Sequence, residues 1–176
     1  TTEAYEFIFR NPPDIRNAYC ITILITSIGT GVGLIFLTMT AFVISRKDFK
    51  YRNVISFYFY FTTLFNGGMV CTYIFYIQYY GLKDNLLALI LPGLTPVFYM
   101  LIMRNFVSGI PSALIESAKI DGAGEVRIFF QIVLPLLGSG LATIGLFMAL
   151  TYWNDWYNAM LYINTEWKYP LQYMLY

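Results

Sequence analysis

The chain has 176 residues and a formal net charge of +1; 58% of its residues are apolar or aromatic and 12% are charged. An average soluble domain contains roughly 25% charged residues. This composition excludes a water-soluble domain and predicts an integral membrane protein.

Four charge-free stretches are long enough to cross a bilayer, which requires about 20 apolar residues per helix. We predict spans at about residues 18–45, 53–82, 85–103 and 128–154. These stretches are apolar on every face, whereas the strands of a membrane barrel alternate polar and apolar residues. The predicted fold class is therefore an all-α membrane protein, with residues 1–176 forming a single polytopic bundle of transmembrane helices.

Two of these spans contain residues that disfavour a straight helix. Asn66, Gly67 and Gly68 interrupt the second span near its middle. Pro92 and Pro96 predict a kink in the third, because proline removes a helical hydrogen bond and clashes with the preceding turn. The second and third spans are therefore expected to be irregular.

Basic residues gather in two of the connecting segments. The loop after the first span and the loop at 104–127 contain Arg46, Lys47, Lys50, Arg52, Arg104, Lys119 and Arg127. Loops rich in Lys and Arg remain on the cytoplasmic side of a membrane. We therefore expect both loops to be cytoplasmic and both ends of the chain to lie outside.

Several kinds of chemistry have no basis in this sequence. It contains no histidine, which argues against a histidine-based catalytic triad and a typical zinc site. No Gly-Lys pair is present, although the phosphate-binding loop of nucleotide hydrolases requires one. The predicted spans also lack the ionisable residues that proton-coupled carriers use. We expect neither an enzyme nor a cofactor within this chain.

The segment 104–127 predicts a short helix. Pro111 or Ser112 can begin it, and Asp121-Gly122 can end it, with glycine in the left-handed conformation. A helix of about two turns is not stable alone, because isolated helices shorter than roughly 12–15 residues are marginal in water. This helix therefore needs a surface that holds it.

Two surfaces could hold such a helix. Leu114, Ile115 and Ala118 form an apolar face beside the polar Glu116, Lys119 and Asp121, which suits a groove on a partner protein. The alternative is a helix lying flat on the lipid surface. Its acidic residues disfavour that alternative, because anionic lipids repel them.

The same segment resembles a known signature. Glu116-Ser117-Ala118, then Asp121-Gly122-Ala123, then Ile132 and Leu134-Pro135, are similar to the loop of permease subunits of bacterial ABC importers, with Ser117 in place of the usual alanine. The resemblance extends over the chain and is closest to the carbohydrate branch, the maltose-type and oligosaccharide or polysaccharide permeases. Its further matches are Ser45–Phe49, Phe65–Gly68, Leu89–Gly93, Trp153-Asn154 and Asn158-Ala159.

This resemblance implies a type I importer permease with six spans, of which the chain lacks the first and the last. The implied partners are a second homologous permease subunit, a cytoplasmic ATPase dimer that binds ATP and Mg, an extracytoplasmic sugar-binding protein and membrane lipid. The implied location is the bacterial cytoplasmic membrane. The segment 104–127 would be the coupling loop, with ATPase contacts at Glu116, Ser117, Ala118, Asp121 and Gly122.

Four residues are candidates for contacts with a sugar. Aromatic rings stack on sugar rings and amides bind hydroxyl groups, which points to Asn66, Tyr73, Tyr99 and Asn154 if they face the pathway. Each has a structural alternative in packing or in anchoring at the membrane interface. An importer of a non-sugar solute, and a non-transporting scaffold or channel subunit, remain alternative functions.

Overall fold

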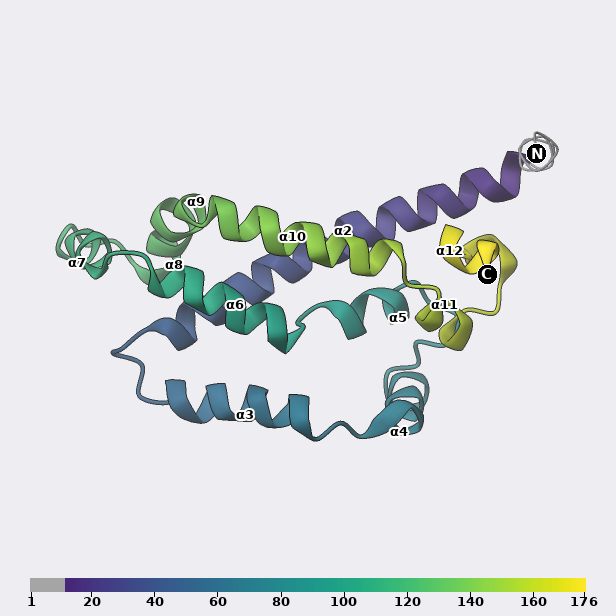
Figure 1. Ribbon diagram of the computed structural model, residues 1–176, viewed down its shortest axis with the longest axis horizontal. Coiled ribbons are helices and arrows are strands. Elements are labelled where there is room, and N and C mark those ends of the chain that lie inside the picture. The colour runs from purple at the N-terminus through teal and green to yellow at the C-terminus, as the bar shows by residue number, and fades with distance from the viewer. Residues whose placement is uncertain (1–11) are drawn as a thin grey trace. The chain divides into compact units, whose positions relative to one another are not determined.

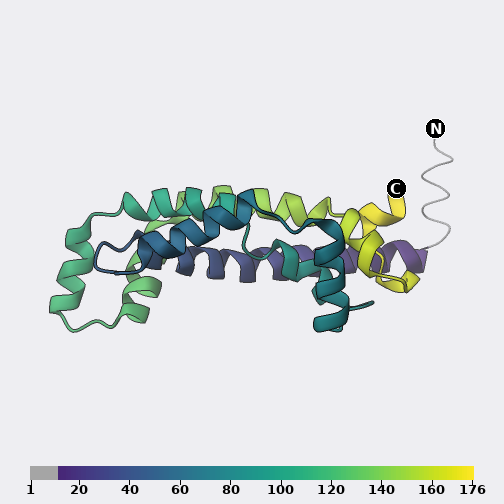
Figure 2. The ribbon, with the colours of Figure 1, turned by 90° about the horizontal axis from the view of Figure 1, so that it is seen from below.

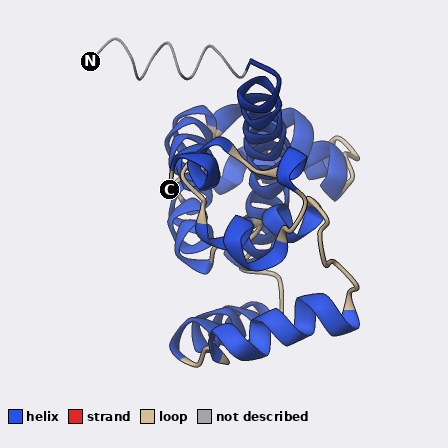
Figure 3. Cartoon of the chain, turned by 90° about the vertical axis from the view of Figure 1, so that its right-hand side faces the viewer, coloured by secondary structure: helices blue, strands red, loops and turns tan. Residues whose placement is uncertain are grey.

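The computed structural model describes residues 12–176, and the described part of the chain is helical, with no strand (Figure 3). This confirms the predicted all-α class. The helices shown in Figure 1 are α2 (Pro12–Ser45), α3 (Arg52–Leu64), α4 (Gly68–Ile74), α5 (Leu87–Ile90), α6 (Val97–Ser108), α7 (Ser112–Ile120), α8 (Glu125–Ile128), α9 (Leu134–Leu136), α10 (Gly138–Trp153), α11 (Tyr157–Tyr162) and α12 (Leu171–Leu175). Short π-helical or 3₁₀ turns continue three of them, at Phe75–Tyr79, Leu91–Gly93 and Phe129–Val133, and a separate 3₁₀ turn lies at Glu166–Lys168.

One helix is long and apolar enough to cross a membrane by itself, the Ile15–Ser45 part of α2. Three further pairs of helices qualify if each broken pair is counted as one span, giving up to four spans. The breaks follow Leu64, Gly93 and Leu136. The first two breaks lie where Asn66–Gly68 and the prolines predicted irregular helices.

The predicted end of the third span, Met103, lies inside a longer helix. Helix α6 continues through Arg104 and ends at Ser108. A charged residue marks where a chain leaves the lipid, but it does not end a helix, because arginine has a high helix propensity. The segment 104–127, predicted to couple to an ATPase, therefore begins within α6.

The chain divides into two compact units. One consists of the described part of residues 1–30 with 67–93 and 148–176, and the other of residues 31–66 and 94–147. Helices α2 and α10 contribute to both.

In the first unit, Tyr152 at the end of α10 is buried and its hydroxyl donates to the carbonyl oxygen of Ile90 at 2.8 Å. The tyrosine ring lies directly against Gly29 of α2 and Gly93, where a Cβ atom would approach the ring to 2.7 and 2.9 Å. These glycines permit close contact between the helices.

The turn before α5 is fixed by Asp84, which has a φ of 56°. Its carboxylate accepts hydrogen bonds from the backbone N–H groups of Asn164 and Thr165 and from the Thr165 hydroxyl, and it pairs with Lys168 at 2.7 Å. These contacts join two segments about 80 residues apart in the sequence.

The second unit has an aliphatic and methionine core. Its large buried apolar side chains include Leu37, Ile44, Met100, Met103, Ile128, Val133 and Ile144. Phe106 of α6 packs on Gly140 of α10, where a Cβ atom would lie 2.9 Å from the ring. This core supports the short helices α7 to α9 that project from it (Figure 2).

Candidate functional site: the α7 coupling segment

Helix α7 has the predicted limits. Pro111 precedes it in an extended conformation, and Ser112–Ile120 are helical. Gly122 has a φ of 78°, the N–H of Ala123 donates to the carbonyl of Ala118, and the N–H of Gly122 donates to that of Lys119. This is the glycine C-cap that occupies otherwise unpaired helix carbonyls. The prediction of a short helix ended by Gly122 is confirmed.

The side chains of α7 divide into an inner and an outer set. Ala118 is buried in the chain's own structure, and Ile115 is half-buried. Glu116, Ser117, Asp121 and Gly122 are exposed, and the Ser117 hydroxyl donates back to the carbonyl of Leu114. The side chains of Glu116 and Asp121 form no ion pair within residues 12–176. Their charges therefore face outward from the chain.

The exposed apolar residues of α7 differ from the predicted face of Leu114, Ile115 and Ala118. Ala118 contacts the chain itself, whereas Ile120 is 86% exposed and Leu114 is 43% exposed. Ile120 was missed in the sequence because it lies at the end of the helix, outside the Leu114, Ile115 and Ala118 stripe. The available signal was a large apolar residue directly before a polar Asp-Gly stop.

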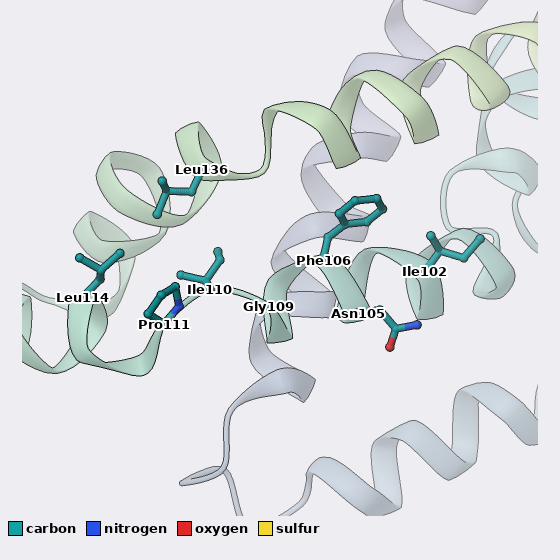
Figure 4. Close-up of a pocket in the computed structure, with 8 residues that line it drawn as sticks. All are labelled: Ile102, Asn105, Phe106, Gly109, Ile110, Pro111, Leu114 and Leu136. Atoms are coloured by element: carbon teal, nitrogen blue, oxygen red, sulfur yellow. The ribbon is translucent and has the colours of Figure 1, made fainter.

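A pocket of about 560 Å³ lies beside α7 (Figure 4). Ile102 and Phe106 of α6, Leu114 of α7 and Leu136 of α9 line it, and Asn105 adds the polar side chain. Because Leu114 lines this pocket, part of the predicted apolar face is turned along the chain instead of outward.

Lys119 is on the inner side of α7. Its ammonium group pairs with Asp48, which follows α2, at 3.3 Å and with Glu125, the first residue of α8, at 3.1 Å. These two carboxylates hold the pKa of Lys119 above its usual range, Glu125 having the larger effect. Residues 12–176 contain no group of three His, Cys, Asp or Glu side chains that could hold a metal ion.

The four candidate sugar contacts lie in different surroundings. Tyr73 stacks on Tyr162, and Tyr99 stacks on Phe147, with ring centroids 5.8 and 6.3 Å apart. The Asn154 amide donates to the carbonyl of Leu150, and its oxygen accepts from Gln172.

Asn66 is exposed in the break between α3 and α4. Tyr73 and Asn154 belong to the first compact unit, Asn66 and Tyr99 to the second. Their contact with substrate remains a prediction.

The sequence matches one protein family, described as the inner membrane component of binding-protein-dependent transport systems, over residues 21–163. The chain belongs to this family. The match covers α7 and all four regions of predicted spans. It confirms the resemblance to importer permeases and the membrane location, and it favours a transport component over a scaffold.

Relatives of this permease family member are similar over almost all of its length. It is 42% identical over 173 residues to the polygalacturonan/rhamnogalacturonan transport system permease protein YtcP of Bacillus subtilis, covering 98% of this chain and 60% of the relative. It is 41% identical over 175 residues to protein LplC of the same species, covering 99% and 59%. The chain thus spans about three fifths of the relatives it matches.

A solved structure has the same fold. It is a bacterial ABC transporter involved in the import of the acidic polysaccharide alginate, with a TM-score of 0.91 and 31% identity, covering 98% of this chain and 61% of that chain. This similarity confirms the predicted permease fold.

Proposed function

We propose that this chain is the membrane-spanning part of a permease that forms half of the pathway for an oligosaccharide or polysaccharide fragment. Support comes from relatives whose names specify carbohydrates: polygalacturonan and rhamnogalacturonan, and alginate. The proposed partners are a second homologous permease, a cytoplasmic ATPase dimer that binds ATP and Mg, and an extracytoplasmic sugar-binding protein.

The observation that carries the coupling role is the exposed outer surface of α7. A helix of nine residues presents Ile120 and Glu116 outward, while its C-terminus is closed by Gly122. Ile120 is 86% exposed and Leu114 43% exposed on the same short helix, which supplies apolar area for a groove on a partner protein. We propose that Ile120 inserts into a groove of the ATPase and that Glu116 pairs with a cation at its rim.

The mechanism follows from a two-state switch. Closure of the ATPase dimer on ATP would displace α7 as a rigid body, and the permease would change from inward-open to outward-open. ATP can shift this equilibrium only because the ATPase binds it more tightly in the closed state. Docking of α7 would couple closure of the ATPase dimer to the change of the permease from inward-open to outward-open.

Recognition of the sugar would rely on neutral groups in this chain. The predicted spans contain no charged residue, so aromatic rings and amides are the available contacts, with Asn66, Tyr73, Tyr99 and Asn154 as candidates. Any carboxylates of an acidic sugar would have to be matched by the partner permease or by the sugar-binding protein.

The test is ligand-stimulated ATP hydrolysis by the full-length complex in lipid vesicles. Oligogalacturonides, neutral oligosaccharides and amino acids would each be added with the binding protein. We expect stimulation by one of the oligosaccharide classes. Stimulation by amino acids alone would show that this family member imports a non-sugar solute, and no stimulation with any class would contradict the proposal.

A further inference from the structure

Four charged side chains form a closed ring, which we call the loop ion cluster: Arg46, Asp48, Lys119 and Glu125. Arg46 is at its centre. Its Nε and Nη2 donate to the two carboxylate oxygens of Asp48 at 2.9 and 2.6 Å. Its Nη1 and Nη2 donate to those of Glu125 at 2.9 and 3.3 Å. One guanidinium therefore holds two carboxylates, each through both oxygens.

The cluster joins three segments that are distant in the sequence. Arg46 and Asp48 directly follow α2, Lys119 lies in the last turn of α7, and Glu125 is in the first turn of α8. A cation near a helix C-terminus and an anion near an N-terminus each oppose the local helix dipole. Positive and negative side chains alternate around the ring and sum to zero. The cluster therefore joins the ends of α7 and α8 and has no net charge.

Ordinary surface ion pairs contribute little, because water screens them and two side chains lose freedom. Arg46 differs, since its side chain is only 14% exposed and lies over the Phe42 ring at 5.5 Å. Phe42 in turn contacts Phe129, 5.7 Å between centroids. A bidentate pair between arginine and a carboxylate fixes the orientation of the two groups as well as their distance. The cluster is therefore anchored to the apolar interior of its own unit.

We propose that Arg46 is a positioning residue for ATP coupling. It binds Glu125 of α8 directly and fixes the two carboxylates that hold Lys119 of α7, so that displacement of α7 is transmitted to the end of α2. The inference rests on the proposed function, since it requires an ATPase that moves α7. Without Arg46, Asp48 and Glu125 lose one of their two shared partners, and only Lys119 still connects them. The loop between α7 and α8 would then bend, and less of the displacement of α7 would reach α2.

The experiment measures uptake and ATP hydrolysis together in vesicles containing the full-length complex. Arg46→Gln and Glu125→Gln are each expected to lower the solute transported per ATP on the order of tenfold, the usual range of coupling between sites. Binding of the ATPase and ATP hydrolysis should remain. A purely structural defect would instead lower transport and hydrolysis in parallel.

The double variant Arg46→Gln/Glu125→Gln should lose less coupling than the product of the two single losses, because both substitutions remove the Arg46–Glu125 contact. Lys47→Gln is the matched control, since Lys47 is exposed and forms no ion pair within residues 12–176. The inference is overturned if Arg46→Gln behaves like Lys47→Gln, or if the losses of the two single variants multiply. Should Arg46→Gln fail to assemble, the exposed Glu125 position provides the test alone, and normal coupling in Glu125→Gln overturns the inference.

These outcomes are separable from failure of the proposed function. That failure appears in the wild-type complex, as absence of ligand-stimulated ATP hydrolysis. The present inference fails only when the wild-type complex is stimulated and the Arg46 and Glu125 variants remain normally coupled.

Discussion

Tyr152 and Gly29 are in direct contact: the aromatic ring occupies the space where a side chain at position 29 would begin. The hydroxyl of the same tyrosine donates to the carbonyl of Ile90. One side chain therefore joins α10 to α2 and to α5, and its ring leaves no room for even a methyl group at Gly29.

Replacement of Gly29 by alanine should destabilise the protein by about 1–3 kcal/mol, the usual cost of adding atoms to a packed interior. The reason is the 2.7 Å approach between the new Cβ atom and the ring. Gly31→Ala is the control, because it lies in the same helix and has no atom within 4 Å of its Cβ position. Thermal unfolding of the purified complex in detergent measures both, and equal midpoints would contradict the packing argument.

Asp84→Asn should destabilise the turn before α5 at pH 7. Hydrogen bonds from Lys168 and then Thr165 hold the pKa of Asp84 well below its usual range. The ionised carboxylate therefore favours the folded state. This contribution is complete above the unfolded pKa of roughly 4 and is lost as the pH falls through the lowered folded value.

The midpoint difference between wild type and Asp84→Asn should thus be largest near neutral pH and shrink below about pH 4. Glu166→Gln serves as the control, because this nearby carboxylate forms no ion pair within the described residues. A difference that stays constant from pH 7 to the acid range would argue against an ionic role.

Ile120→Ser should weaken binding of the ATPase about tenfold, since an apolar anchor at an interface contributes at least 1 kcal/mol. Co-purification or titration of the ATPase measures the effect. Trp167→Ser is the comparison: it also removes an exposed apolar side chain, but one on the side expected to face outward. Equal binding by wild type and Ile120→Ser would remove Ile120 from the docking surface.

Glu116→Lys should abolish the pairing with a cationic groove and uncouple transport from ATP hydrolysis, without unfolding the spans. The residue is exposed and forms no ion pair in the described chain, so its charge is not needed for the fold. Vesicle uptake and hydrolysis assays report the change, and Glu116→Gln separates loss of the charge from its reversal. Normal uptake by Glu116→Lys would contradict the coupling role.

Orientation can be tested with two exposed lysines. In a background without Cys20 and Cys71, Lys50→Cys should resist a membrane-impermeant thiol reagent in intact cells, whereas Lys83→Cys should react. Lys50 belongs to a basic loop expected in the cytoplasm, and Lys83 to a turn expected outside. The reverse pattern would place α7 on the wrong side of the membrane for an ATPase.

Local signals made α7 predictable. Proline restricts the backbone and glycine permits the left-handed conformation that ends a helix, so Pro111 and Gly122 made both limits of α7 predictable from a few neighbouring residues. The break near Asn66 was predictable for the same reason. The family resemblance was also local, because it depended on the order of residues in one loop and a few short motifs.

Contacts across the sequence were not predictable in this way. Arg46 was recognised as a basic loop residue, but its partner Glu125 is 79 positions away, and their contact depends on tertiary packing that includes Phe42 on Phe129. Tyr152 stands among several aromatic residues at the end of α10, and nothing in its local sequence marks it as buried. Its burial depends on glycines in two other segments, and no local pattern connects them.

The break between α3 and α4 restricts what can surround this part of the chain in a membrane. Every residue from 60 to 71 is exposed on the isolated chain, including the non-helical stretch from Phe65 to Gly67. Lipid cannot hydrogen-bond a non-helical backbone, so such a stretch is tolerated only against protein or water. In the assembled permease we therefore expect this break to face protein or water instead of lipid.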